Sequence, residues 1–215
     1  ATAPGNDDAG NWCKGTSAYG SGDLGTPGQP NSPCATISKT SCLDNGTARE
    51  ILAPQPGDLV ITEFMADPNA VADSNGEWFE VYAARAVDLN GLELGTEPGK
   101  PKTTLGGTEC LVAKAGSFVV FARSSDSAVN GGLPAVDHLF GFSIVNSNGR
   151  LVLSWAGGTL DQITYASAGA GRSASLKPAK LTAADNDDTA NWCAASTSYG
   201  KGDLGTPGSA NGGCP

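Results

Sequence analysis

The amino-acid sequence predicts an all-β fold, a sandwich of two antiparallel sheets, for most of the chain. Thirty glycines and 13 prolines among 215 residues count against helices, because a helix interior tolerates these two residue types least. Short runs rich in β-branched and aromatic residues alternate with turn residues, and six or more such strands at this spacing are typical of a sandwich. The six cysteines, an even number, predict disulfides.

Six segments in the body of the chain have the composition of strands. Within 76–83, Trp78 and Glu80 fall on one face and Phe79 on the other, because successive side chains of a strand point to opposite faces. We expect Glu80 to face solvent or to cap a turn. The predicted strands are 58–66, 76–83, 87–95, 117–123, 150–156 and 159–166.

Glycines mark the predicted turns between these strands. Asn148-Gly149 and Gly157-Gly158 are typical of tight hairpin turns. Gly116 precedes an apolar run and suits a turn that needs positive φ before a buried strand. This order predicts a sandwich over residues 58–215, a Pro-rich linker over 43–57 that ends in APQPG, and an N-terminal arm over 1–42.

The arm contains a second copy of the segment that closes the chain. Residues Asn6–Cys34 and Asn186–Cys214 are identical at 17 of 29 positions without a gap, which sets a period of 180 residues. No strand-like apolar run appears in the first copy. Because a closing segment also opens the chain, it reads as the tail of a preceding module. We therefore expect a slice of a tandem array, or a subunit that meets its neighbours end to end.

The cysteine spacing repeats with the segment, at 21 residues in each copy. Structural zinc sites usually contain a Cys-x-x-Cys pair, which this chain lacks, so disulfides are favoured over metal binding. Such bridges persist outside the reducing cytosol, which predicts a secreted or cell-surface protein. Other pairings stay open on sequence alone. The simplest pairings are Cys13–Cys34, Cys193–Cys214 and Cys42–Cys110.

The charge balance argues against two classes of partner. The net charge is −9 and the 13 lysines and arginines are scattered, so nucleic acid should be repelled. No apolar run approaches the roughly 18 residues that a bilayer-spanning helix needs. No leader with a charged and then an apolar stretch opens the chain, so a signal peptide, if there was one, is expected to have been removed.

Five motifs in the body resemble the lamin tail domain, an immunoglobulin-like sandwich found in nuclear lamins and in secreted bacterial proteins. In order they read GDLVITEFMADPN, DSNGEWFEVY, VDLNGLELG, LVAKAGSFVVFAR and FGFSIVNSNGRLVLSW. The terminal YGKGDLGTPGSAN, with Tyr199, Asp203, Pro207 and Asn211, is similar to the closing motif of the bacterial branch. The resemblance covers about Gly57–Asn211, and residues 6–31 match the closing motif alone.

The resemblance implies an immunoglobulin-like β-sandwich with a non-catalytic structural or adhesive role and no catalytic residues to carry over. Together with the disulfides and the acidic charge, it places the chain among the bacterial extracellular members. The residues agree. His138 is the one histidine, and its neighbour Asp137 would point to the opposite face of a strand. Glu77 and Glu80 also fall on opposite faces, which counts against a pair of catalytic carboxylates.

Calcium is the one cofactor that the sequence suggests. One acidic loop offers oxygen ligands on alternate residues around a glycine turn, and a second candidate lies at residues 185–188, although neither matches an EF-hand. The alternative is that these side chains stabilise turns through Asx geometry. The predicted ligands are Asp73, Asn75 and Glu77 in one loop and Asp185, Asp187 and Asp188 in the other.

The first copy carries the main hypothesis for a partner. Trp12, Tyr19 and Leu24 correspond to residues that should hold the second copy against the sandwich, yet the first copy has no module of its own. We expect these side chains to contact a neighbouring subunit or module, which gives a head-to-tail fibre when the contact does not close. Stacking of the aromatic residues on a sugar, and a leftover of processing, are the alternatives.

The sequence therefore predicts a non-enzymatic extracellular structural or adhesive module. One alternative is an accessory domain of a larger secreted hydrolase, which would position the enzyme or bind it to its substrate. A weaker alternative is a Ca²⁺-dependent adhesin. The sequence names no ligand and no oligomeric state.

Overall fold

In a computed structural model the described residues are 12, 14–31 and 40–213, and they fall into two compact units. Unit 1 takes its residues from 1–51 and 107–111, and unit 2 from 52–106 and 112–215. The described helices are short: α1 (Asp73–Gly76), α2 (Ala183–Asn186) and a 3₁₀ turn (Thr189–Asn191). Among these residues, no helix has the length and apolar character needed to span a bilayer. The predicted all-β fold is confirmed.

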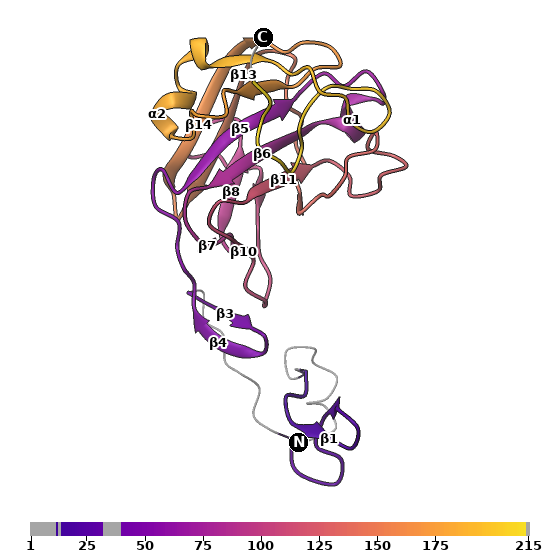
Figure 1. The fold of residues 1–215 in the computed structure, drawn as a ribbon. Coiled ribbons are helices and arrows are strands. Elements are labelled where there is room, and N and C mark those ends of the chain that lie inside the picture. Colours follow the sequence, from indigo (N-terminus) through magenta and orange to yellow (C-terminus); the bar gives the residue numbers. More distant parts are fainter. Residues whose placement is uncertain (1–11, 13, 32–39, 214–215) are drawn as a thin grey trace. The chain divides into compact units, whose positions relative to one another are not determined.

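Unit 2 is built from two main sheets (Figure 1). Neighbouring strands are antiparallel except β11 and β12, which pair in parallel. The six-stranded sheet has the order β12 (His138–Leu139), β11 (Phe118–Ala122), β6 (Trp78–Ala83), β5 (Leu59–Met65), β15 (Ala174–Leu176) and β16 (Trp192–Ala194). The four-stranded sheet has the order β14 (Gly158–Ser167), β13 (Ser147–Trp155), β8 (Leu92–Gly95) and β9 (Thr103–Thr104). A small sheet pairs β7 (Val87–Asp88) with β10 (Val112–Ala113).

Aromatic side chains fill the space between the two main sheets. Phe64 of β5 lies 4.4 Å from Tyr165 of β14, measured between ring centroids, so these side chains join the two layers. On the same face of the six-stranded sheet, Phe79 stacks on Phe121 at 4.8 Å. Phe64, Phe79 and Phe121 are all buried, as the alternation in the sequence predicts for an inward face.

The outer face of the six-stranded sheet is buried as well. All seven residues of β5 are buried, although an antiparallel sheet commonly leaves one face to solvent. The C-terminal segment, yellow in Figure 1, crosses this face of β5 and β6. Beneath it, Met65, Trp78 and Leu133 form an apolar cluster against which Tyr199 packs. Of the two expectations for Glu80, exposure to solvent is wrong, because its exposed fraction is 0%. The other, that it caps a turn, agrees with the bond that it accepts from the Gly208 nitrogen in the turn at 206–209.

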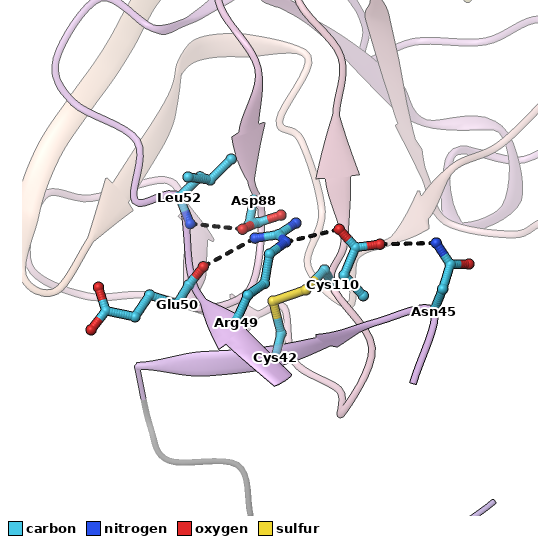
Figure 2. Close-up of a disulfide and its surroundings, with 8 residues drawn as sticks. Cys42, Asn45, Arg49, Glu50, Leu52, Asp88 and Cys110 are labelled. Carbon is cyan, nitrogen blue, oxygen red and sulfur yellow. Dashed lines mark hydrogen bonds and ion pairs between the residues drawn. A yellow bond between two sulfur atoms is a disulfide. The ribbon is translucent and has the colours of Figure 1, made fainter. Parts of the chain in front are cut away.

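Unit 1 contains a disulfide-linked hairpin. Strands β3 (Ser41–Asp44) and β4 (Thr47–Glu50) pair across Asn45-Gly46, whose φ angles of 49° and 83° suit a two-residue turn. Cys42 bonds to Cys110, which confirms that predicted pairing (Figure 2). The Arg49 guanidinium is tied to Asp44 and to the backbone oxygen of Glu50. The linker predicted over 43–57 is therefore wrong over its first half, where the chain forms this hairpin.

The predicted turns are confirmed in part. Gly116 has a φ of 80° before β11, as predicted. The β13–β14 hairpin turns at Ala156-Gly157, with φ angles of 50° and 81°. Asn148-Gly149, in contrast, lies inside β13 and pairs with β14. The segment predicted as one strand over 87–95 is divided into β7 and β8, because the chain turns at Leu89–Gly91.

Candidate functional site: the closing segment and its acceptor face

The most elaborate polar site in unit 2 lies where residues 197–211, here called the closing segment, dock on the outer face of the six-stranded sheet. Two buried carboxylates receive its donors. The Thr206 backbone nitrogen and hydroxyl donate to Glu63, at 3.0 Å to Oε1 and 2.8 Å to Oε2. The Gly208 nitrogen donates to Glu80 Oε2 at 2.8 Å. The carboxylates thus fix the position of the segment along β5 and β6.

Both carboxylates are also held from the sheet side. Ser173 and Ser175 of the β15 region donate to Glu63 Oε1, and the Thr62 hydroxyl donates to Glu80 Oε1 at 2.9 Å. Burial raises the pKa of Glu63 above its ordinary value. Burial, with the nearby Glu63 as second cause, raises the pKa of Glu80 to about 8. The raised pKa favours the protonated form of Glu80, which reduces repulsion between the two groups.

Two further side chains of the closing segment bind backbone groups. Asp203, buried, accepts hydrogen bonds from the backbone nitrogens of Asn69 and Ala70 at 3.0 and 3.2 Å. Asn211 donates to the backbone oxygens of Thr62 and Leu176 at 2.8 and 2.7 Å. We call the surface that receives these groups the acceptor face. It comprises Glu63, Trp78 and Glu80, the nitrogens of residues 69 and 70, and the oxygens of residues 62 and 176.

Trp78 is the apolar centre of the acceptor face. Its indole nitrogen donates to the Tyr199 hydroxyl at 2.8 Å, and the two rings meet edge to face. Gly205 passes so close that an added Cβ would lie 2.9 Å from Trp78 Cζ2 and 3.2 Å from Glu63 Oε1. Only glycine leaves room for this approach without displacing the rings or the carboxylate.

Tyr199→Phe should lower the free energy of unfolding of unit 2 by about 1 kcal/mol, because the buried indole nitrogen loses its acceptor. Chemical denaturation followed by fluorescence measures this change. The matched control is Tyr19→Phe at the corresponding position of the first copy, where the side chain is 44% exposed. An equal loss in both variants would contradict the role given to the Trp78–Tyr199 bond.

Residues 17–31, here called the N-terminal copy, have the same local structure as the closing segment. The two stretches are identical at 10 of 15 positions. In the N-terminal copy β1 (Ala18–Tyr19) pairs with β2 (Asp23–Leu24). Three left-handed glycines are shared, and their φ angles agree between the copies. The angles are 55° at Gly20 and 47° at Gly200, 113° at Gly22 and 114° at Gly202, and 74° at Gly28 and 81° at Gly208. The matching backbone hydrogen bonds are Gly22 to Tyr19 and Gly202 to Tyr199, Gly25 to Ser17 and Gly205 to Thr197, and Gln29 to Thr26 and Ser209 to Thr206.

The two copies differ in exposure. Asp203 and Asn211 are buried at 3% and 7%, whereas the corresponding Asp23 and Asn31 are exposed. The three predicted contact residues are also exposed: the exposed fractions of Trp12, Tyr19 and Leu24 are 64%, 44% and 61%. Their counterparts Trp192, Tyr199 and Leu204 are each less exposed. The N-terminal copy therefore has the shape and side chains of a docked segment, with those side chains open to solvent.

The first predicted calcium loop has other contacts. Glu77 is 1% exposed and pairs with the Arg123 guanidinium at 2.9 Å, and burial raises its pKa to about 7. Asp73 begins α1 and accepts from the Asn146 side chain at 3.3 Å, and the Asn75 backbone nitrogen donates to the Ala72 oxygen in that turn. The side chains that contact Asp73 and Glu77 are thus an amide and a guanidinium.

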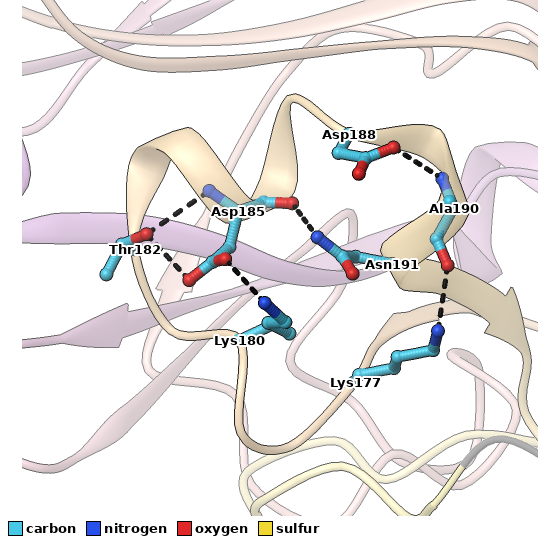
Figure 3. A network of polar contacts seen from close by, with 7 residues as sticks. All are labelled: Lys177, Lys180, Thr182, Asp185, Asp188, Ala190 and Asn191. Atoms are coloured by element: carbon cyan, nitrogen blue, oxygen red, sulfur yellow. Dashed lines mark hydrogen bonds and ion pairs between the residues drawn. The ribbon is translucent and has the colours of Figure 1, made fainter.

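The second predicted calcium loop, around α2, is a network of turn contacts (Figure 3). Asp185 accepts from the Thr182 hydroxyl at 2.7 Å and from Lys180 at 3.2 Å, and the Thr182 bond lowers the pKa of Asp185. Asp188 caps the 3₁₀ turn through the Ala190 nitrogen at 2.9 Å, which is the Asx geometry expected as the alternative.

Over the described part of the chain, neither acidic loop brings three carboxylate, imidazole or thiolate ligand atoms within 4.8 Å of one another. This holds for the loop with Asp73, Asn75 and Glu77 and for the loop with Asp185, Asp187 and Asp188. Calcium binding stays a prediction.

Of the remaining residues singled out in the sequence, some belong to the described structure and some lie outside it. Cys193 is disulfide-bonded, and its predicted partner Cys214, like Cys13 and Cys34, lies outside the described residues. Trp192 packs edge to face on Phe64 at 5.7 Å, which supports the anchoring interpretation over sugar stacking. His138 lies on the edge strand β12, and burial lowers its pKa.

Comparison with protein-family models found no match, and comparison with curated proteins found none either. The resemblance of the sequence motifs to the lamin tail domain thus stays a prediction. The site is defined by its geometry: a repeated segment, one copy of which is docked on two buried carboxylates.

Proposed function

We propose that this chain is a non-catalytic extracellular structural or adhesive module that joins neighbouring units through its N-terminal copy. One observation carries the proposal: residues 17–31 repeat the backbone hydrogen bonds of a segment that docks in unit 2, while most of these residues are exposed. The Cys42–Cys110 disulfide supports a location outside the reducing cytosol. The resemblance of the body to the lamin tail domain supports the non-catalytic role.

The type of assembly follows from where the two partners of such a contact lie. A segment near one end of a chain that contacts a different surface on the next chain makes a heterologous contact. Repetition of that contact gives a ring if the rotation closes and an open filament if it does not. Trp12, Tyr19 and Leu24 are large apolar side chains that are exposed, and exposed apolar surface is typical of interaction sites.

Assembly should therefore depend on the N-terminal copy and on Trp12, which precedes it in the chain. We expect the mass of the full chain in light scattering to rise with protein concentration, and filaments or short oligomers to be seen by negative-stain microscopy. Replacing Trp12, Tyr19 and Leu24 by serine should keep the chain at the mass of one molecule. The matched control replaces Leu139 and Val145, which are 48% and 50% exposed in unit 2.

The control variant should assemble as the unaltered chain does. Identical masses for the unaltered chain and the triple variant at every concentration would overturn the proposed function.

A further inference from the structure

We propose that the N-terminal copy is a ligand for the acceptor face of another molecule with this sandwich, and that it binds there as the closing segment binds in its own chain. This inference rests on the proposed function and names the partner surface: two buried carboxylates beside a tryptophan, flanked by the backbone nitrogens and oxygens that bond Asp203 and Asn211 of the closing segment.

The groups of the closing segment that bind the acceptor face have counterparts in the N-terminal copy. Thr26 corresponds to Thr206, whose backbone nitrogen and hydroxyl bind Glu63. Within each copy the threonine hydroxyl also bonds the asparagine five residues later, at 2.8 Å for Thr26 and 3.1 Å for Thr206. The threonine is thus already oriented in the exposed copy. The other counterparts are Asp23 for Asp203, Gly28 for Gly208, Asn31 for Asn211 and Tyr19 for Tyr199.

One glycine of the N-terminal copy is best explained by docking. In the closing segment, Gly205 needs to be glycine because Trp78 and Glu63 lie against it. The corresponding Gly25 does not have a left-handed φ, and among the described residues the atoms within 4 Å of an added Cβ belong to the Tyr19 ring. A flexible tyrosine ring can move away, so the local structure of the copy does not demand glycine there. A close approach to an acceptor face does.

The acceptor face itself needs such a ligand. Glu63, Trp78 and Glu80 are each 1% exposed or less with the closing segment in place. Without a segment, the Trp78 ring and the donors around both carboxylates would be uncovered together. Buried polar groups without partners cost free energy, so an open acceptor face favours any segment that supplies the same donors.

The closing segment competes for the same face and has two advantages in its own chain. It is tethered, which corresponds to an effective concentration of roughly millimolar. In addition, Lys201 donates to the backbone oxygen of Ala128 at 2.7 Å, and the N-terminal copy has Ser21 at that position. The contact between unaltered chains should therefore be weak, and it should strengthen when the closing segment is weakened.

The test weakens the closing segment and leaves the N-terminal copy intact. The weakened chain carries Asp203→Ala and Thr206→Val, which remove the bonds to residues 69 and 70 and the hydroxyl bond to Glu63. The matched chain carries the same two changes plus Asp23→Ala and Thr26→Val. Light scattering gives the mass of each chain over a concentration series, and urea denaturation gives the midpoint of unit 2.

We expect the weakened chain to assemble more readily than the unaltered chain, and its urea midpoint to rise with protein concentration. The matched chain should stay monomeric, with a lower midpoint that does not depend on concentration. Equal mass and equal midpoint for the two chains would overturn the proposal. If both chains stay monomeric but the matched chain, which lacks Asp23 and Thr26, has the lower urea midpoint, then the N-terminal copy binds the acceptor face of its own chain. That result would overturn the proposed contact between molecules.

A second measurement covers the case in which the weakened chain does not fold. A synthetic peptide of residues 14–31 is added, and folding is followed by Trp78 burial in the fluorescence spectrum. The peptide should restore the folded signal, and the same peptide with Asp23→Ala and Thr26→Val should not. Failure of both peptides alike overturns the proposal.

The outcome is separable from that of the proposed function. If the unaltered chain stays monomeric while the weakened chain assembles through Asp23 and Thr26, the acceptor face is the partner surface and self-assembly of the unaltered chain is ruled out. If the unaltered chain assembles through Trp12, Tyr19 and Leu24 but the weakened and matched chains behave alike, the copy contacts a different surface and the inference fails.

Discussion

Replacing Glu63 by alanine should lower the free energy of unfolding of unit 2 by about 3–5 kcal/mol, because several buried hydrogen-bond donors lose their acceptor at once. The carboxylate receives Thr206 from the closing segment and Ser173 and Ser175 from the β15 region. Because Glu63 is fully buried, its removal also leaves a void between the sheet and the segment. Urea denaturation measures the loss, and limited proteolysis should then cut within residues 197–211.

Two further variants separate the causes. Glu63→Gln keeps the volume but turns one acceptor into a donor, so we expect a smaller loss than in the alanine variant. Glu97→Ala is the surface control, because this carboxylate is exposed and its ion pair with Lys100 lies at the surface of unit 2. A Glu63→Ala variant as stable as Glu97→Ala would contradict the view that the carboxylate fixes the closing segment.

Unit 2 should become less stable as the pH rises from 5 to 9. Burial raises the pKa of Glu80 to about 8 and that of Glu77 to about 7, from an ordinary value of 4.5. Between these limits the folded state binds a proton that the unfolded state has released. The stabilisation is complete below pH 4.5 and is lost as the pH passes the folded-state pKa. Each group contributes a slope of about −1.4 kcal/mol per pH unit.

Thermal melts at half-unit steps of pH measure this slope. In the Glu80→Gln variant the part of the slope between pH 7 and 8 should disappear, because Glu77 has already ionised there and the substituted side chain does not titrate. A melting temperature that is constant or rises between pH 5.5 and 8.5 in the unaltered chain would show that neither glutamate keeps its proton in the folded state.

The strands of unit 2 could be predicted from the sequence because each is recognisable from the composition of its own residues. Runs such as Leu59–Met65 and Phe118–Ala122 are rich in β-branched and aromatic residues and are bounded by turn residues, so composition and period suffice. The hairpin over 41–50 was missed although Asn45-Gly46 is a strong turn signal. Its strands are four residues each and mostly polar, which hides them from a search for apolar alternation.

Of the candidate site, the closing segment could be predicted from the sequence and the acceptor face could not. The repeat identified the segment and predicted Tyr199 as an anchor, since both copies are visible as sequence, but it did not single out Thr206, which binds Glu63. The acceptor face was not predicted, because its partners are far apart along the chain: 143 residues between Thr206 and Glu63, and 128 between Gly208 and Glu80. Glu80 alternates with apolar residues as a solvent-facing strand residue would, and nothing local reveals that a distant segment covers it.

The distance between Asn211 and Thr62, 149 residues, also sets the order in which the molecule forms. A ribosome releases β5 and β6 long before it releases residues 197–211, so a nascent chain holds Trp78 and two carboxylates uncovered until synthesis of the body is finished. Contacts of such long range are also slow to form, because the entropy of closing the loop is lost before the contact is gained. Maturation of unit 2 should therefore end with this step.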